Sequence, residues 1–296
     1  MSIAQQRTGS FETAASEAGR RKTILGRIML WAVSIAIAIY VFVPLYWVFI
    51  QSFMLEPDIF RWPPYVVPPR VTLVNYTKIF TMPDTPVMRW FFNSAFVSFS
   101  RIGLELTIAT LAAYAFARLE FPGRDKIFFG ILTTMMIPGQ VTLIPTYLLM
   151  SRLKWIDTYH ALIWPGAASV FPIFMLRQFF QTIPQELEEA AILDGCGRLR
   201  VLWKVIVPLS TPAFSALAIF IFMGNWNALF WPLIITNSLE MRTLVPGLTI
   251  LRGTYSTQRG LVMAAAAFSV VPVMIFYAIF QRRIIEGVAM TGLTGQ

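Results

Sequence analysis

The sequence TIPQELEEAAILDGCGRLRVLWKVIVP occupies residues 182–208, between two long apolar stretches. Pro184 suits the first turn of a helix, where its missing N–H costs nothing. Three glutamates then fall near the positive end of the helix dipole, namely Glu186, Glu188 and Glu189. Gly195 can close this helix in a left-handed conformation, and a second short helix is expected from Arg198 to about Ile206. The stretch therefore predicts two short helices on a membrane surface, joined by small residues that a partner could approach closely.

The regions outside this loop are typical of membrane spans. A helix crosses a hydrocarbon core of about 30 Å with about 20 mostly apolar residues. Six stretches match that length, at residues 28–53, 91–117, 127–150, 161–180, 209–236 and 261–280. They contain prolines that a helix bundle tolerates at kinks or gaps: Pro44, Pro138, Pro145, Pro165, Pro172, Pro232 and Pro272. The sequence thus predicts an all-α, polytopic membrane protein with six transmembrane helices.

The composition agrees with this class and argues against several others. Hydrophobic residues make up 56% of the chain and charged residues 13%, against about 25% charged in soluble domains. The single cysteine, Cys196, and the single histidine, His160, predict neither a metal site nor a catalytic cluster. The net charge of +9 comes without a basic run, so we expect the lipid bilayer and not nucleic acid as partner. No Gly-x-x-x-x-Gly-Lys-Ser/Thr loop is present, so we expect no nucleotide cofactor on this chain.

The distribution of basic residues predicts the orientation. With the amino terminus inside, fourteen Lys and Arg residues fall in cytoplasmic segments and nine in outer segments. Both termini are therefore expected in the cytoplasm. We divide the chain into a flexible amino-terminal tail at residues 1–22, a six-helix domain at 23–283 with its cytoplasmic loop at 181–208, and a carboxy-terminal tail at 284–296.

Two sets of polar residues lie inside the predicted spans. Arg101 and Glu105 are four residues apart on one helix face, where they either neutralise each other or line a substrate path. The other set combines amides, a hydroxyl and an aromatic ring that suit sugars, although interhelical hydrogen bonding explains the polar groups equally well. Its members are Gln140, Thr142, Asn225, Trp226 and Asn227.

The loop at 181–208 resembles the EAA loop of permease subunits from ATP-binding cassette (ABC) importers. Glu189-Ala190-Ala191, Gly195 and Pro208 carry the resemblance. The chain departs from the usual pattern in having Cys196 after the glycine, and Val205 and Val207 before the proline. Further short matches are most similar to maltose-type sugar permeases, and their order and spacing strengthen the likeness. They include Phe92-Asn93-Ser94, Ala113-Tyr114-Ala115-Phe116-Ala117-Arg118, Trp226-Asn227 and Gln281-Arg282-Arg283.

The resemblance implies a type I ABC importer permease fold in a bacterial inner membrane. It also implies partners: a second permease subunit in a heterodimer, an ATPase dimer that holds ATP and Mg, an extracytoplasmic solute-binding protein, and a sugar or oligosaccharide. By the same likeness, Glu189 would face a basic group of the ATPase, while Ala191 and Gly195 would permit close docking. Ala190, Asp194 and Pro208 complete the expected coupling loop.

Other functions stay open at this point. A self-sufficient secondary transporter or channel is the main alternative. One intramembrane ion pair, however, offers few groups that could couple transport to protons or sodium ions. An intramembrane enzyme would need a nucleophile or metal constellation that the composition does not provide. The mildly basic outer segments leave an acidic sugar as one possible substrate.

Overall fold

The computed structural model describes the backbone of residues 3–292 and the side chains of residues 26–280. All regular structure in residues 3–292 is helical. The first half of the chain holds α1 (Ile3–Ser52), α2 (Glu56–Ile59), α3 (Val74–Thr81), α4 (Val87–Arg118), α5 (Arg124–Thr133), α6 (Gly139–Arg152) and α7 (Tyr159–Ile163). The second half holds α8 (Val170–Thr182), α9 (Glu186–Leu193), α10 (Arg198–Val201), α11 (Val207–Leu209), α12 (Thr211–Trp226), α13 (Phe230–Ile235), α14 (Leu244–Thr254) and α15 (Arg259–Gly292). Short 3₁₀ turns at Thr134–Met136 and Trp164–Gly166 follow α5 and α7, and a π-helical turn at Leu202–Ile206 follows α10.

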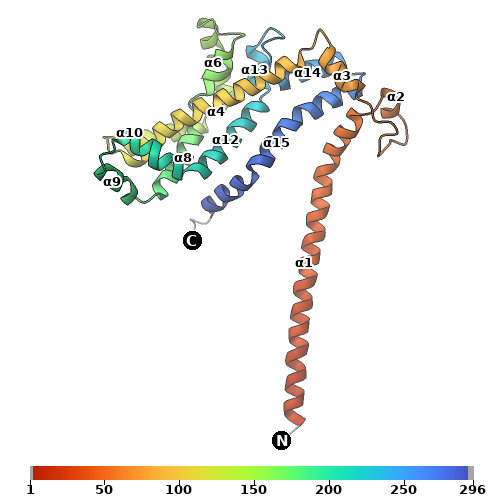
Figure 1. Ribbon diagram of the computed structural model, residues 1–296, viewed down its shortest axis with the longest axis vertical. Helices are drawn as coiled ribbons and strands as arrows, with labels where there is room; N and C mark the ends of the chain where they lie inside the picture. The colour runs from red at the N-terminus through yellow and green to blue at the C-terminus, as the bar shows by residue number, and fades with distance from the viewer. Residues whose placement is uncertain (1–2, 293–296) are drawn as a thin grey trace.

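The centre of the bundle is α4, a 32-residue helix that packs against α8 and α12. α15 packs against α12 on one side and against the carboxy-terminal end of α1 on the other (Figure 1). Most of α1 stands away from the other helices (Figure 1), and its apolar side chains between Ile28 and Val43 are exposed. A bare apolar helix of this length is stable only in lipid or against another apolar surface.

The ends of the bundle carry different loops (Figure 1). The α9 end carries α9, α10 and the link between α4 and α5. The α14 end carries α2, α3, α13 and α14. Each end has its own hydrophobic cluster. Around α8 it includes Tyr114, Leu176, Phe180 and Leu202. Around α14 it includes Trp90, Phe222, Leu244 and Leu251.

Three single helices are long and apolar enough to cross a membrane, with spans at Gly26–Ser52, Val87–Arg118 and Arg259–Phe280. Three bent pairs raise this number to six within the described residues if each pair is one span. The predicted all-α polytopic fold is therefore confirmed. The third, fourth and fifth of the predicted stretches are each broken, with bends of 97°, 45° and 80° in chain order, in line with the kinks or gaps expected at prolines.

Proline explains the largest break. The predicted span at 127–150 bends by 97° between the 3₁₀ turn that ends at Met136 and the start of α6 at Gly139. Pro138 lies in that gap, where it has no N–H to donate and holds Ile137 extended at ψ 117°. In contrast, Pro44, Pro145 and Pro272 lie inside helices that continue past them. Proline thus marks a break only where neighbouring residues also leave the helix.

The predicted span at 209–236 is also divided. α12 ends at Trp226, and residues 230–235 form the separate short helix α13. At its start, α12 meets the segment Arg198–Leu209 at 80°. The break falls at Ser210, between Pro208 and Pro212.

The backbone at both ends of the chain is helical in the regions predicted as tails. The backbone of residues 3–22 continues α1, and α15 continues through residues 284–292. The flexibility predicted for residues 1–22 stays a prediction. Residues 1–2 and 293–296 lie outside the described residues.

Candidate functional site

The loop at 181–208 folds as the two short helices that the sequence predicts. α9 ends at Leu193, and Gly195 follows in a left-handed conformation with φ +83°. The N–H of Gly195 donates to the carbonyl of Ile192, and the N–H of Cys196 donates to that of Ala191, both at 2.9 Å. These two bonds form a Schellman motif, which satisfies carbonyls at the helix end. The predicted closure of the helix by Gly195 is confirmed.

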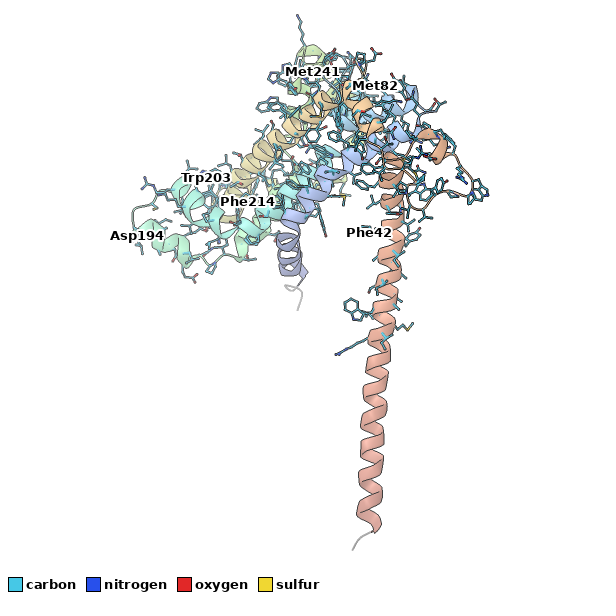
Figure 2. The ribbon with its side chains drawn as sticks, turned by 45° about the vertical axis from the view of Figure 1, so that its right-hand side comes forward. Phe42, Met82, Asp194, Trp203, Phe214 and Met241 are labelled. Carbon is cyan, nitrogen blue, oxygen red and sulfur yellow. The ribbon has the colours of Figure 1, made fainter. Side chains whose placement is uncertain are left out.

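The residues proposed for coupling lie together on the outer surface of this loop. Glu189, Ala190, Asp194 and Gly195 are exposed, and Ala191 is half-buried. Figure 2 shows Asp194 at the tip of the α9 end, far from Met82 and Met241 at the α14 end. A β-carbon added at Gly195 would meet no atom of the chain within 4 Å. The space around Gly195 is therefore open to a partner. Pro208 is exposed too, where the second loop helix approaches α12.

The inner face of α9 is fixed by a buried ion pair that sequence reasoning missed. Nε of Arg118, at the end of α4, lies 2.6 Å from Oε1 of Glu188, and the two side chains are 5% and 6% exposed. The hydroxyl of Tyr114 donates to the other carboxylate oxygen at 3.3 Å. The Arg118 guanidinium also donates to the carbonyls of Phe180, at 2.6 Å, and Ile183. One side chain therefore joins α4, the end of α8 and α9.

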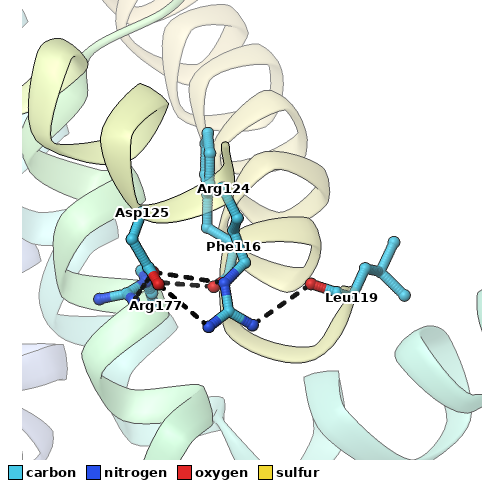
Figure 3. Close-up of polar contacts among 5 residues, drawn as sticks. All are labelled: Phe116, Leu119, Arg124, Asp125 and Arg177. Carbon is cyan, nitrogen blue, oxygen red and sulfur yellow. Dashed lines mark hydrogen bonds and ion pairs between the residues drawn. The ribbon is translucent and has the colours of Figure 1, made fainter. Parts of the chain in front are cut away.

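A second, more exposed group of charges lies at the same end (Figure 3). Asp125, at the start of α5, is 3.3 Å from both Arg124 and Arg177. Arg177 also donates to the carbonyl of Phe116 at 3.2 Å, and its guanidinium lies 4.1 Å from the Phe128 ring centre. The Asp125 side chain is 69% exposed, so water screens these ion pairs.

A partly open cavity of about 560 Å³, termed the central cavity, lies between α4, α6, α12 and α13. Its lining includes three residues predicted for a substrate path, Gln140, Thr142 and Asn225, together with Arg101. Thr146 and Trp231 line it as well. The break at Pro138 turns α6 so that its first residues face this cavity. The structure thus brings together polar residues from α4, α6 and α12.

Arg101 and Glu105 form the predicted pair across one helical turn. Their nearest N and O atoms are 3.3 Å apart, and Glu105 is buried. Arg101 also donates to the carbonyl of Ile163 at 3.1 Å, and its guanidinium packs directly against Gly166. Arg101 therefore does both things that the sequence left open: its charge is neutralised by Glu105, and its side chain lines the cavity.

Trp226 and Asn227 do not line the central cavity. Trp226 is buried, stacks on Phe222 and donates from its indole N–H to the carbonyl of Ser269 on α15 at 3.1 Å. The Asn227 side chain donates to the carbonyl of Met223 within its own helix. The Trp226 bond is interhelical, as in the alternative that the sequence left open. A role for either residue in the substrate path stays a prediction.

At the α14 end, neutral side chains hold an irregular loop. The Asn93 side chain donates to the carbonyls of Glu240 and Arg242, each at 2.7 Å, and accepts a bond from the Tyr159 hydroxyl at 2.6 Å. The indole N–H of Trp90 donates to the carbonyl of Leu239 at 2.6 Å. These bonds fix residues 239–242 against the start of α4.

The aspartate Asp157 holds the same loop from the other side. Its carboxylate accepts the backbone N–H groups of Asn237 at 2.9 Å and Ser238 at 3.1 Å. Burial by itself would raise the pKa of Asp157. The bonds from Ser238 and Asn237, with the charge of Arg242, outweigh burial and lower that pKa below its ordinary value.

Comparison with known proteins agrees with this geometry. Residues 105–289 match the family described as "Binding-protein-dependent transport system inner membrane component". The arabinooligosaccharides transport system permease protein AraQ of Halalkalibacterium halodurans is 32% identical, over 93% of this chain and all of AraQ. The trehalose/maltose transport system permease protein MalG of Thermococcus litoralis is 31% identical, over 93% of this chain and all of MalG.

A solved structure shares the fold. A chain from a bacterial ABC transporter involved in the import of the acidic polysaccharide alginate superposes with a TM-score of 0.77. It is 24% identical, and the match covers 89% of this chain and 97% of that one. The family match takes in more than half of the chain, including α9, the buried Arg118–Glu188 ion pair, and the cavity residues of α6 and α12. The chain therefore belongs to the binding-protein-dependent transport system inner membrane components, as a multi-pass translocation subunit of the inner membrane.

Proposed function

We propose that this chain is one of two permease subunits of an ABC importer that moves a sugar or oligosaccharide into the cytoplasm. The observation that carries this proposal is the similarity, along almost the full chain, to permease subunits named for oligosaccharide and disaccharide transport. An external solute-binding protein would deliver the sugar. A second, different permease would complete the path, and a separate ATPase dimer would bind ATP and Mg.

The orientation follows from the placement of basic residues. α9, the start of α1 and the end of α15 lie on one side of the molecule, away from the α14 end (Figure 1). We place the α9 end in the cytoplasm, because the excess of Lys and Arg falls there. Both termini are then cytoplasmic.

The α9 loop is the surface on which the ATPase would dock. Glu189 offers a negative charge, and Ala190 and Gly195 let another protein approach the backbone. A shift of the docked α9 would pass to α4 through the Arg118–Glu188 ion pair, because that pair is buried and further held by the end of α8. Since α4 also carries Arg101 to the central cavity, the loop and the sugar path would move together.

The central cavity would form this subunit's part of the sugar path. Gln140, Thr142 and Asn225 present amide and hydroxyl groups that can exchange hydrogen bonds with sugar hydroxyls. The Arg101–Glu105 ion pair leaves the cavity without a large net charge. Selection for an acidic sugar would therefore depend on groups outside the pair.

Substitutions at two glycines test the docking surface. Gly195→Leu should insert in the membrane at a normal level but lose ATPase copurification and sugar uptake, because the side chain would occupy the docking space. Gly197→Leu is the matched control. Gly197 is exposed in the same loop with open space around it, but its φ of −72° suits any residue. Gly195→Ala separates backbone strain from bulk.

Glu189→Ala should give a milder defect, because it removes one charge contact at a solvated edge. Copurification, ATP hydrolysis and uptake should be measured on the same preparations. Normal uptake by Gly195→Leu would contradict docking at this loop. Robust ATP turnover by the isolated chain would contradict the division of labour between permease and ATPase.

The charge of the sugar can be tested at the intramembrane pair. Neutral and uronate-containing oligosaccharides of equal length should be compared for uptake by the wild type and by Glu105→Gln. Loss of the carboxylate leaves the Arg101 charge unbalanced, so the ratio of uronate to neutral uptake should rise. An unchanged ratio would mean that Arg101 does not meet the sugar.

A further inference from the structure

A second cavity lies where α1, α14 and α15 meet, apart from the central cavity and the α9 loop. Its volume is about 470 Å³. Trp47 and Gln51 line it from the last turns of α1, and Arg252 and Arg259 line it from α14 and α15. Val262 and Met263, further along α15, complete its apolar part. The cavity is thus polar toward the α14 end of the bundle and apolar toward the membrane interior.

The amide of Gln51 faces this cavity without a partner. Gln51 is only 8% exposed, and its side chain makes no hydrogen bond to any described residue. Its amide atoms are not sealed off from solvent, so the cavity leaves both its donor and its acceptor open to a ligand. A ligand with oxygen atoms in the cavity would pair with this amide.

The two arginines give the cavity a positive charge that no lining carboxylate balances. Neither forms an ion pair with a described residue; the Arg259 guanidinium lies 4.7 Å from the Phe60 ring centre. The acidic group that contacts this region is Glu56. Its carboxylate accepts the backbone N–H groups of Arg259 at 3.1 Å and Gly260 at 2.8 Å, so its charge is directed to the start of α15.

The depth of the cavity matches the boundary between headgroups and acyl chains. The apolar spans of α1 and α15 reach Ser52 and Arg259 at this end. Trp47 lies five residues inside the first limit, about 8 Å along a helix, and Met263 lies about 6 Å inside the second. Tryptophan is enriched at this level, and basic side chains there attract anionic lipids.

We propose that this cavity binds an anionic phospholipid, with its phosphate between Arg252, Arg259 and Gln51. The acyl chains would lie beside Met263 and along the exposed apolar length of α1. In the orientation proposed above, this lipid belongs to the outer leaflet. A free anion such as inorganic phosphate has the same charge but does not match the apolar part of the cavity. The proposal requires only a membrane-spanning chain, so it is independent of the transported sugar.

The test uses the assembled importer in nanodiscs that contain equal amounts of phosphatidylglycerol and phosphatidylcholine. Lipid that stays bound after extraction into mild detergent should be measured by native mass spectrometry. We expect phosphatidylglycerol to be retained in preference. Arg252→Gln and Arg259→Gln should each weaken its retention about fivefold, which corresponds to about 1 kcal/mol for one basic residue near an anionic surface.

Two further variants make the test specific. Arg70→Gln is the control, because Arg70 is an exposed arginine outside the spans that does not line the cavity. It should retain the lipid as the wild type does. Gln51→Leu keeps the charge but removes the amide, and should weaken retention without changing its dependence on salt.

Three outcomes would overturn the proposal. The first is equal retention of the two lipids by the wild type. The second is unchanged retention of phosphatidylglycerol by the Arg252→Gln/Arg259→Gln double variant at normal membrane level. The third is displacement of phosphatidylglycerol by millimolar inorganic phosphate, which would identify a free anion as the occupant.

Discussion

The two ends of the bundle hold their loops by different chemistry. At the α9 end, a charged side chain of α4 binds a charged side chain of the loop helix, as Arg118 does with Glu188. At the α14 end, neutral side chains of α4 bind backbone carbonyls of an irregular loop, as Asn93 does with Glu240 and Arg242. α4 takes part at both ends, so it connects the loop that would dock the ATPase to the loop on the opposite face.

The difference follows from what each loop offers. α9 is a helix, so its backbone groups are mostly satisfied internally and only side chains remain for bonding. Residues 239–242 form no regular structure, so their carbonyls need partners from elsewhere. A buried ion pair also resists separation more strongly than a neutral bond, because each charge would be left in a medium of low polarity. The α9 helix is therefore expected to be attached to α4 more strongly than the irregular loop at the other end.

The largest effect is expected at the α9 end. Arg118→Gln leaves Glu188 buried without its cation and releases the carbonyls of Phe180 and Ile183. We expect the free energy of unfolding to fall by about 3–5 kcal/mol. Thermal denaturation in detergent should show a lower midpoint, and uptake per ATP hydrolysed should fall in complexes that still assemble. Arg118→Lys should be intermediate, since it keeps the charge but loses the planar fork of donors.

The matched control is Asp125→Asn at the same end. Asp125 also pairs with an arginine from another helix, but its side chain is 69% exposed. Its removal should cost no more than about 1 kcal/mol and leave uptake per ATP unchanged. If both variants behaved alike, burial would not be the reason for the strength of the Arg118–Glu188 contact. If Arg118→Gln reduced only the amount of complex, the ion pair would hold the fold without coupling α9 to α4.

The α9 loop was largely predictable from sequence, whereas its attachment was not. The run of glutamates and Gly195 are local signals found where they were expected, including the left-handed φ at Gly195. Pro184 was expected in the first turn, but α9 begins at Glu186, so the proline lies just before the helix. Nothing local separates Glu188 from Glu186 or Glu189. Only the position of Arg118, seventy residues earlier in the chain, decides that Glu188 is buried. Arg118 at the end of span two and Glu188 in the loop helix were therefore not recognisable as partners without the fold.

The same limit applies to the spans and the cavities. Hydropathy located six apolar stretches, but it did not tell the continuous helix around Pro272 from the 97° break at Pro138. The spacing of Arg101 and Glu105 predicted their ion pair, since four residues form one helical turn. The cavity of Trp47, Gln51 and the two arginines joins the first span to the last. Such contacts depend on packing between distant segments. The backbone carbonyls that Asn93 binds at the α14 end also have no sequence signature, because every residue carries one.

A smaller loss of stability is expected at the α14 end. Asn93→Leu removes two bonds to backbone carbonyls and the acceptor of the Tyr159 hydroxyl, at a similar side-chain volume. We expect a decrease of about 2–3 kcal/mol, because each bond contributes about 1 kcal/mol and the buried carbonyls lose their donors. Hydrogen exchange should increase in residues 239–242 but not in α9. Faster exchange in α9 as well would show that the two ends are not independent.

The smallest effect is a pH dependence at Asp157. The folded protein lowers the pKa of this carboxyl group, so its ionised form binds the loop more tightly than its neutral form. The stabilisation is therefore present above the ordinary aspartate pKa, about 3.9, and is lost as pH falls through the lower folded value. At neutral pH the contact is fully formed. Acidification should release residues 236–238 in the wild type.

Asp157→Asn isolates the charge in this test. Asp157 has φ +62°, a conformation that asparagine also tolerates, so the substitution adds little backbone strain. The asparagine carbonyl can still accept the N–H of Asn237 or Ser238, but without a charge. Protection of residues 236–238 from hydrogen exchange, measured relative to the intrinsic exchange rate at each pH, should be slightly lower in the variant at neutral pH. It should no longer fall as the pH drops through the aspartate range. If the variant lost protection on acidification as the wild type does, another group would be titrating, and the carboxylate of Asp157 would not be what fixes the loop.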